Sequence, residues 1–268
     1  MQQAEQPIRV EHRGNIAIVT LNRPAKYNAL TPGLLLELHQ VLSDLSQRDE
    51  IRCLIIRGAG DKAFCSGYDL GQLPTSPTPE IARLLEENPN PLGLGLEAIT
   101  AFPYPVIAML NGVAIGAGCE LAVTCDIRIG ADNIRMGMPP SKLGLVYGPS
   151  GIRKFIDLVG PANTRELFLT AKFVDAGRAL QMGLVNYLLP PDELEEFTLT
   201  MAADIAEKAP LALRGIKRII NLLLEGGELD EAGNAEAGAL VAASLGSDDL
   251  KEGQRAFLEK RKPVFRGP

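Results

Sequence analysis

The chain has 268 residues, of which 46% are hydrophobic and 22% are charged, and its formal net charge is −6. This composition is ordinary for a globular protein with a sizeable core, and the acidic balance argues against a nucleic-acid-binding surface. The two histidines and four cysteines show no ligand-like spacing, which argues against a metal site, a histidine-based triad and a disulfide framework. We therefore expect a cytoplasmic protein with reduced thiols, and no apolar run is long enough to predict a membrane span.

The first 60 residues predict a strand pair, a capped helix and a buried strand. The elements are strands at 8–10, 16–21 and 53–56 and a helix at 34–45. Thr31 and Pro32 suit the N-cap and first position of the helix. The apolar run at 53–56 is typical of a strand covered on both faces.

Two loops follow. Within the loop from Gly58 to Asp69, Gly67 allows a sharp turn, so that the N–H of Tyr68 could point into a cleft; the alternative is a plain surface loop. Residues 71–91, which contain prolines, threonines and acids, predict a second loop that is mobile at its start and shapes the substrate pocket. A helix is expected ahead of Phe102.

The most informative stretch runs from Asn111 to Asp126, directly after an apolar strand at 106–110. Its glycines and alanines predict a tight turn into a helix, whose first N–H groups lack intrahelical acceptors. Negative charge developing on an oxygen could be stabilised there. The alternative is a turn in which glycine only relieves crowding. Glu120 is the one acid in the apolar run that follows the turn.

The rest of the chain predicts an α/β part followed by helices. A strand is expected at 126–130, a loop rich in glycine and proline at 136–148, and a short strand at 185–189. Amphipathic spacing predicts helices at 150–158, 165–169, 175–182, 193–208, 210–224, 229–245 and 248–260.

Two of these stretches resemble motifs of the crotonase (enoyl-CoA hydratase/isomerase) superfamily: Ala-Phe-Cys-Ser-Gly-Tyr-Asp-Leu at 63–70 and Gly-Ala-Gly-Cys-Glu-Leu-Ala at 116–122. The resemblance covers nearly the whole chain. It implies an α/β spiral of ββα units over 1–195 and a helical oligomerisation region over 196–268. It also implies a homotrimer or dimer of trimers and an acyl-CoA thioester substrate that reacts through an enolate. No cofactor is implied beyond the CoA of the substrate.

The resemblance assigns roles to individual residues. The two oxyanion-hole N–H groups fall on Tyr68 and Ala117, and alanine in place of the commoner glycine is tolerable if its φ is negative. Hydratases of the family use two glutamates as acid and base. The first maps onto Glu120, where the alternative is a structural acid, but the second maps onto Pro140, which cannot transfer a proton.

A closer resemblance links residues 140–147 and the C-terminal tail to bacterial methylmalonyl-CoA decarboxylases. Decarboxylation forms the enolate without a base. Tyr147 matches a tyrosine that could orient the leaving carboxylate by a hydrogen bond; the alternative is a core aromatic whose hydroxyl has a backbone partner. These decarboxylases typically carry histidine where this chain has Tyr68, so that substrate choice is expected to differ.

The resemblance also suggests which residues contact the substrate. Phosphates of CoA pair favourably with Arg and Lys side chains. The expected substrate-binding residues are Arg23, Lys26, Lys62, Ala63, Gly116, Pro140, Phe257 and Lys260.

Three functions remain open from the sequence. The first is a lyase that decarboxylates a methylmalonyl-CoA-type thioester. The second is an enoyl-CoA hydratase or isomerase that uses Glu120 as its only acid or base. The third is an inactive CoA-binding protein that keeps the scaffold.

Overall fold

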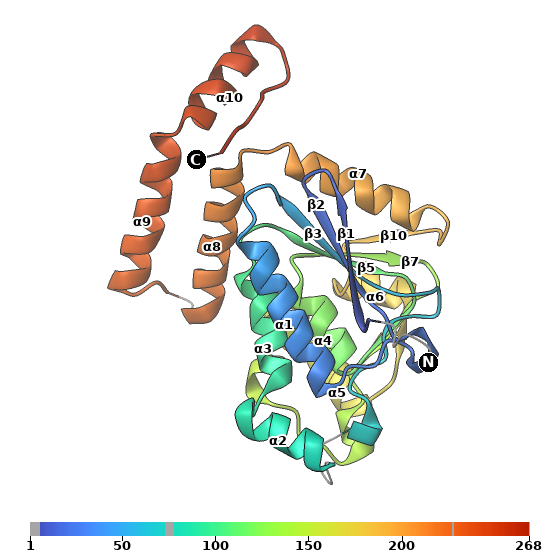
Figure 1. The fold of residues 1–268 in the computed structure, drawn as a ribbon. Coiled ribbons are helices and arrows are strands. Elements are labelled where there is room, and N and C mark those ends of the chain that lie inside the picture. The colour runs from blue at the N-terminus through green and yellow to red at the C-terminus, as the bar shows by residue number, and fades with distance from the viewer. Residues whose placement is uncertain (1–5, 73–77, 227, 268) are drawn as a thin grey trace.

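The computed structural model describes residues 6–72, 78–226 and 228–267. Two sheets form its centre, and helices surround them (Figure 1). Among the described residues, no helix combines the length and the apolar character needed to cross a membrane.

The larger sheet has six strands in the order β1-β2-β3-β5-β7-β10. Their bounds are Ile8–Arg13, Ile16–Leu21, Cys53–Gly58, Val106–Leu110, Ile127–Ala131 and Tyr187–Leu189. β1 pairs antiparallel with β2, and every other neighbouring pair is parallel. All residues of β2 and β5 are buried, which agrees with continuous apolar runs covered on both faces.

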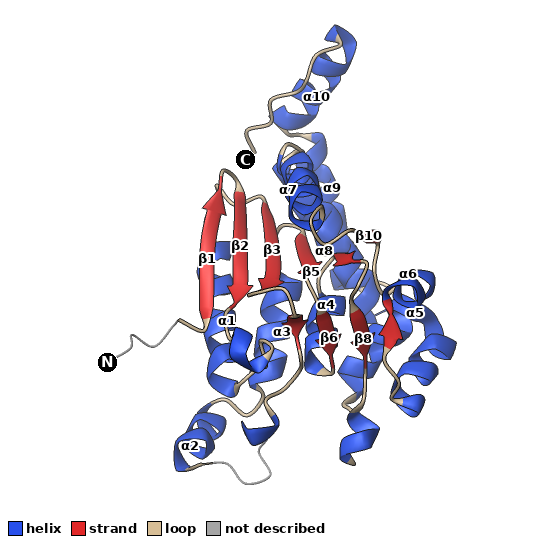
Figure 2. Cartoon of the chain, turned by 90° about the vertical axis from the view of Figure 1, so that its right-hand side faces the viewer, coloured by secondary structure: helices blue, strands red, loops and turns tan. Residues whose placement is uncertain are grey.

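The smaller sheet has four strands in the order β4-β6-β8-β9, with bounds Ala63–Cys65, Val113–Ile115, Arg135–Gly137 and Val174–Asp175. β3, β5 and β7 belong to the larger sheet, and the strands that directly follow them in sequence, β4, β6 and β8, belong to the smaller sheet. Figure 2 shows this step for β5 and β6. Repetition of this step gives the spiral of ββα units that the family resemblance implies. It brings the loops after β4 and β6 together.

The helices are α1 (Pro32–Ser46), α2 (Pro79–Glu87), α3 (Pro91–Ala101), α4 (Ala117–Thr124), α5 (Pro149–Thr170), α6 (Ala176–Met182), α7 (Leu194–Ala206), α8 (Pro210–Gly226), α9 (Glu231–Leu245) and α10 (Asp248–Glu259). α1 packs on α3, and α7 packs against β2, β3, β5 and β7. The N-cap of α1 is Thr31, whose hydroxyl accepts from the N–H of Leu34.

The helices α8, α9 and α10 extend away from the sheets (Figure 1). An ion pair joins α8 to the core, because Nζ of buried Lys217 lies 2.7 Å from Oδ2 of the partly exposed Asp126 side chain and donates to the carbonyl of Tyr104 at 3.0 Å. α7 packs against the larger sheet and therefore belongs with the core. The boundary predicted after residue 195 instead places nearly all of α7 in the C-terminal helical region.

Two sequence predictions of local structure are wrong, and one is confirmed. Residues 79–87, expected in a loop, form α2, because Thr78 caps a helix that begins with Pro79; the mobile start predicted for that loop falls largely on 73–77, outside the described residues. The short strands β4 and β8 lie in or at the edge of segments expected to be irregular. The helices predicted at 150–158 and 165–169 are confirmed as two helical segments within α5, because the backbone of Gly160 (φ 74°, ψ 167°) is non-helical and Pro161 follows it.

Candidate active site

Two loops pack so closely that glycine is required at their contact. A Cβ on Gly67 would lie 2.7 Å from the carbonyl oxygen of Ile115, and φ at Gly67 is +99°. A Cβ on Gly118 would lie 2.2 Å from the carbonyl oxygen of Cys65. The loop after β4 therefore touches the first turn of α4 through backbone alone, and Gly67 lies beside the backbone nitrogen of Ala117.

The contact leaves two backbone N–H groups beside each other without acceptors. Within residues 6–72, 78–226 and 228–267, neither the N–H of Tyr68 nor that of Ala117 donates a hydrogen bond. Ala117 is the first residue of α4, where the helix dipole favours negative charge, and its φ is not positive, as the alanine requires. The positive φ of the turn falls on Gly116 instead (φ 55°).

The residues on either side of Tyr68 are held from behind by Leu30. The N–H of Leu30 donates to the carbonyl of Gly67, and the N–H of Asp69 donates to the carbonyl of Leu30, both at 2.8 Å. Buried Asn28 fixes the segment that carries Leu30, since its amide donates to the carbonyls of Ala59 and Ala63. The orientation of the Tyr68 N–H is therefore set before any ligand binds.

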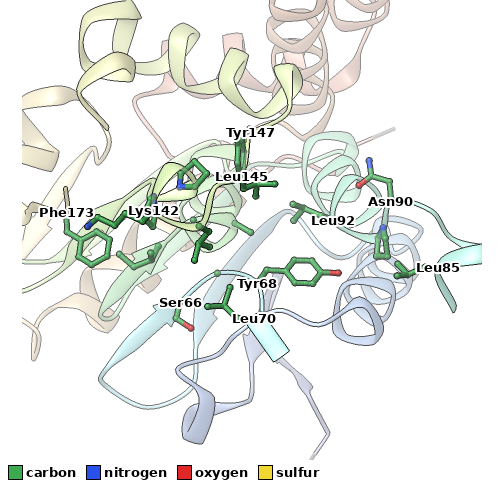
Figure 3. A pocket seen from close by; sticks show the side chains of 18 of the residues that line it. Ser66, Tyr68, Leu70, Leu85, Asn90, Leu92, Lys142, Leu145, Tyr147 and Phe173 are labelled. Atoms are coloured by element: carbon green, nitrogen blue, oxygen red, sulfur yellow. The ribbon is translucent and has the colours of Figure 1, made fainter. Parts of the chain in front are cut away.

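A cavity of about 510 Å³ opens over these two N–H groups (Figure 3). Its walls are mostly apolar, and Figure 3 places Tyr68 and Leu92 toward one end of it and Lys142 with Phe173 toward the other. Among the described residues, no aspartate, glutamate or histidine lines the cavity. The lining residues are Ser66, Gly67, Tyr68, Leu70, Leu85, Pro89, Asn90, Pro91, Leu92, Ile115, Gly116, Ala117, Pro139, Pro140, Lys142, Leu143, Leu145, Tyr147 and Phe173.

Glu120 lies behind the wall of the cavity, and only 4% of its surface is exposed. The Tyr147 hydroxyl donates to Glu120 Oε2, and the Tyr147 ring packs edge-on against Phe168 with the ring centroids 5.6 Å apart. Burial, reinforced by the negative charge of Glu120, raises the pKa of Tyr147 above its ordinary value. Tyr147 therefore stays protonated and separates the carboxylate from the cavity.

The second oxygen of Glu120 faces α5. Lys154 Nζ lies 3.9 Å from Glu120 Oε1 and 2.9 Å from Thr124 Oγ1. Burial lowers the pKa of Lys154, and the Glu120 carboxylate opposes that lowering. A Cβ on Gly151 would lie 2.9 Å from Glu120 Oε1, so only glycine leaves room for the carboxylate here.

The cysteines near the two N–H groups are unsuited to nucleophilic catalysis. Cys65 and Cys119 are fully buried, and burial raises the pKa of each thiol to about 12. A neutral thiol is a poor nucleophile, so covalent catalysis by these residues is excluded.

The predicted site residues divide into three groups by position. Five of them line the cavity, namely Tyr68, Gly116, Ala117, Pro140 and Tyr147. Glu120 lies one hydrogen bond behind Tyr147. The residues assigned to CoA lie elsewhere.

Among the CoA candidates, Arg23 forms an ion pair with Asp69 at 3.0 Å and donates to the carbonyl of Ala29. Lys26 and Lys62 are exposed, whereas Ala63 is buried in β4. Phe257 is 83% exposed, and Lys260 follows it at the end of α10, at the opposite end of the molecule from α2 (Figure 1). One copy of the chain therefore does not bring these two residues to the cavity.

Sequence reasoning did not single out several cavity residues: Leu85, Asn90, Leu92, Lys142 and Phe173. The helical spacing of Ile81, Leu84 and Leu85 after Thr78 and Pro79 is a signal that could have placed Leu85 on a helix. No comparable signal marks Phe173, which reaches the cavity only because β9 pairs with β8.

Fixed N–H donors beside a largely apolar cavity define a class of protein. Such an arrangement is suited to stabilising negative charge on a carbonyl oxygen, as in an enzyme that forms an oxyanion or enolate. The comparisons with known proteins agree with this class. A family model described as enoyl-CoA hydratase/isomerase matches residues 11–268.

Similar proteins span the whole chain. A short-chain-enoyl-CoA hydratase of Clostridium acetobutylicum and a methylmalonyl-CoA decarboxylase of Escherichia coli are each 36% identical over 253 residues, covering 94% of this chain and 95% of the relative. The crystal structure of an enoyl-CoA hydratase from Bacillus anthracis matches with a TM-score of 0.88 and 30% identity, covering 98% of this chain and all of the other. The chain belongs to the enoyl-CoA hydratase/isomerase family and is a crotonase-superfamily enzyme that acts on an acyl-CoA.

Proposed function

We propose that the chain decarboxylates a methylmalonyl-CoA-type thioester through an enolate. The observation that carries this proposal is the composition of the cavity wall. Among the described residues it contains no carboxylate or imidazole, and Pro140 stands where the second glutamate of the family's hydratases is expected. Adding water to a double bond requires an acid and a base within reach of the substrate, whereas decarboxylation requires neither to begin.

The two N–H groups supply the stabilisation that decarboxylation needs. The bond between the α-carbon and the carboxylate breaks, CO₂ leaves, and the electron pair moves onto the thioester oxygen as the enolate forms. Donors from Tyr68 and Ala117 toward that oxygen lower the barrier, and the loss of one such donor costs about 3–4 kcal/mol in an acyl-transfer enzyme. The α-carbon of the enolate then takes up a proton, which completes the reaction.

Tyr147 has a specific part in this proposal. A hydroxyl has one proton, and Tyr147 donates it to Glu120. A substrate carboxylate that reaches Tyr147 competes with Glu120 for this proton, so the tyrosine orients the carboxylate without holding it tightly. Weak binding of the group that must leave keeps the barrier to its departure low.

A second candidate is an enoyl-CoA hydratase or isomerase. One observation favours it: Glu120 lies a single hydrogen bond from the cavity, so that Tyr147 could relay a proton between Glu120 and the substrate. The raised pKa of Tyr147 weighs against this relay, because the tyrosine gives up its proton reluctantly beside an ionised carboxylate. The third candidate, a silent CoA-binding protein, leaves the two unpaired N–H groups without a use.

We also propose that α8, α9 and α10 carry contacts between copies in a trimer or a dimer of trimers. Apolar side chains recur on α8 at Ile216, Ile220, Leu223 and Leu224, and each is at least 45% exposed in the single chain. Light scattering on the purified protein measures the mass directly; a monomer would contradict this proposal.

The function is tested by incubating the purified protein separately with methylmalonyl-CoA and with crotonyl-CoA in D₂O, followed by mass spectrometry of the thioesters. We expect loss of CO₂ from the first with one deuterium at the α-carbon, and no addition of water to the second. Y147F should lower the decarboxylation rate roughly a hundred-fold, as expected for a misplaced leaving group. Hydration of crotonyl-CoA with methylmalonyl-CoA unchanged would replace the decarboxylase proposal with the hydratase. If neither thioester reacts, the decarboxylase proposal fails.

A further inference from the structure

The carboxylate of Glu120 is a charged group in a buried position. One oxygen accepts from the Tyr147 hydroxyl, and the other is 3.9 Å from Lys154 Nζ. Among the described residues, Lys154 is the only cation within 4.0 Å of Glu120. A buried carboxylate is stable only when it is paired and hydrogen-bonded, so the state of Glu120 depends on this lysine.

Lys154 is itself held in place by the helix that carries Glu120. Its ammonium donates to Thr124 Oγ1 at 2.9 Å, and the Thr124 hydroxyl donates to the carbonyl of Glu120 at 2.8 Å. Gly151, one turn earlier on α5, leaves the space through which α5 approaches the carboxylate. Lys154 thus balances the charge of Glu120 and fixes the position of α5 relative to α4 at this point.

We propose that Lys154 is a positioning residue of the active site: its ammonium neutralises and orients Glu120, and through Glu120 it fixes the Tyr147 hydroxyl at the cavity. Lys154 does not line the cavity among the described residues, so it acts through Glu120 and does not touch the substrate. The inference rests on the proposed function, in which Tyr147 meets the substrate carboxylate.

The titratable groups that face Lys154 lie on or directly after α4. They are Glu120 and the buried thiol of Cys125, and Tyr147 lies beyond Glu120. Because burial lowers the pKa of Lys154, its charge is lost at a lower pH than that of an ordinary lysine. As the pH rises, Glu120 loses its counter-charge and Tyr147 loses its fixed partner, so activity should fall on the alkaline side.

A first experiment needs no substrate. In ¹H NMR of the intact protein, a buried hydroxyl proton donated to a carboxylate resonates downfield, and its absence in Y147F assigns it to Tyr147. We expect this resonance to shift or vanish in K154M and to return in K154R, whose guanidinium keeps the charge. R153M is the matched control, since Arg153 is exposed and pairs with Asp157 on the same helix.

A second experiment uses the thioester that the enzyme decarboxylates. We expect K154M to lower kcat roughly ten- to a hundred-fold with KM unchanged, and K154R to restore most of it. In a Y147F background K154M should have no further effect, because both changes remove the same contact. The alkaline half-point of kcat should move upward in K154R by about one pH unit or more, as expected for a cation that does not titrate.

The outcomes separate this inference from the proposed function. If no malonyl-type thioester reacts while the Tyr147 resonance still depends on Lys154, the decarboxylase proposal fails and the structural link survives. The positioning role is overturned if K154M keeps the resonance and kcat of the wild type, or if its effect on kcat adds fully to that of Y147F. K154Q repeats the test if K154M does not fold, because glutamine keeps a hydrogen-bond donor for Thr124 without the charge.

Discussion

Gly151 offers a sharp test of the idea that the Tyr147–Glu120 pair must sit in one position. A Cβ at residue 151 would lie 2.5 Å from Tyr147 Cε1, which falls 0.9 Å short of ordinary contact at 3.4 Å. G151A should therefore displace the tyrosine ring, the carboxylate or the start of α5 by about that distance. A misplacement of this size near the reacting groups can lower kcat on the order of a hundred-fold.

The protein should still fold with this substitution. Gly151 is the third residue of α5, and alanine is the better helix former, which offsets part of the crowding. The assay is steady-state decarboxylation, with circular dichroism to confirm the fold. G148A is the control, because Gly148 has an ordinary φ of −66° and no atom within 4 Å of the added Cβ. If G151A and G148A both keep the wild-type kcat, the position of this pair is not needed for the reaction.

Three further predictions follow from the described contacts. G67A should lower kcat about 10²- to 10³-fold by displacing an oxyanion donor, because the substituted residue would have φ +99° and a Cβ 2.7 Å from a carbonyl oxygen; retention of activity would contradict the assigned hole. E120Q should lower the pKa of Tyr147 toward, but not below, its ordinary value, since the charge is removed and the burial stays; ultraviolet titration against Y147F measures this shift, and an unchanged value would refute the coupling. K217M should reduce the free energy of unfolding in urea by about 1–2 kcal/mol, because it removes the donor to the Tyr104 carbonyl and the counter-charge of the partly exposed Asp126; a change below about 0.5 kcal/mol would mean that solvent replaces the lysine.

Local sequence signals predicted the backbone of the site better than its side chains. The strand at 106–110 has the expected bounds, and Gly67 and Gly116 take the positive φ values that a sharp turn demands. The strand and the two turns depend on residues that are adjacent in the chain, so they can be predicted from the local sequence. The family resemblance then placed Tyr68 and Ala117, whose N–H groups are free among the described residues.

The side-chain partners depend on packing between distant segments. Glu120 and Tyr147 are 27 residues apart, and their hydrogen bond exists because α4 packs on α5. Arg23, predicted to contact a CoA phosphate, pairs with Asp69, which lies 46 residues away in sequence. No periodicity or spacing in the sequence reports such pairs. The segment that holds α2 was expected to shape the pocket, but as a loop and not as a helix.

Both proposed oxyanion donors are main-chain N–H groups, which separates what mutation can change from what it cannot. Every residue except proline supplies an N–H, so the side chains at positions 68 and 117 are free to vary while the donors persist. The backing from Leu30 is likewise made by backbone groups. Selection could therefore reshape the acyl pocket, or exchange histidine for tyrosine beside it, without first losing the ability to stabilise an enolate. A scaffold with this property can acquire new substrates by single steps, each passing through an active intermediate.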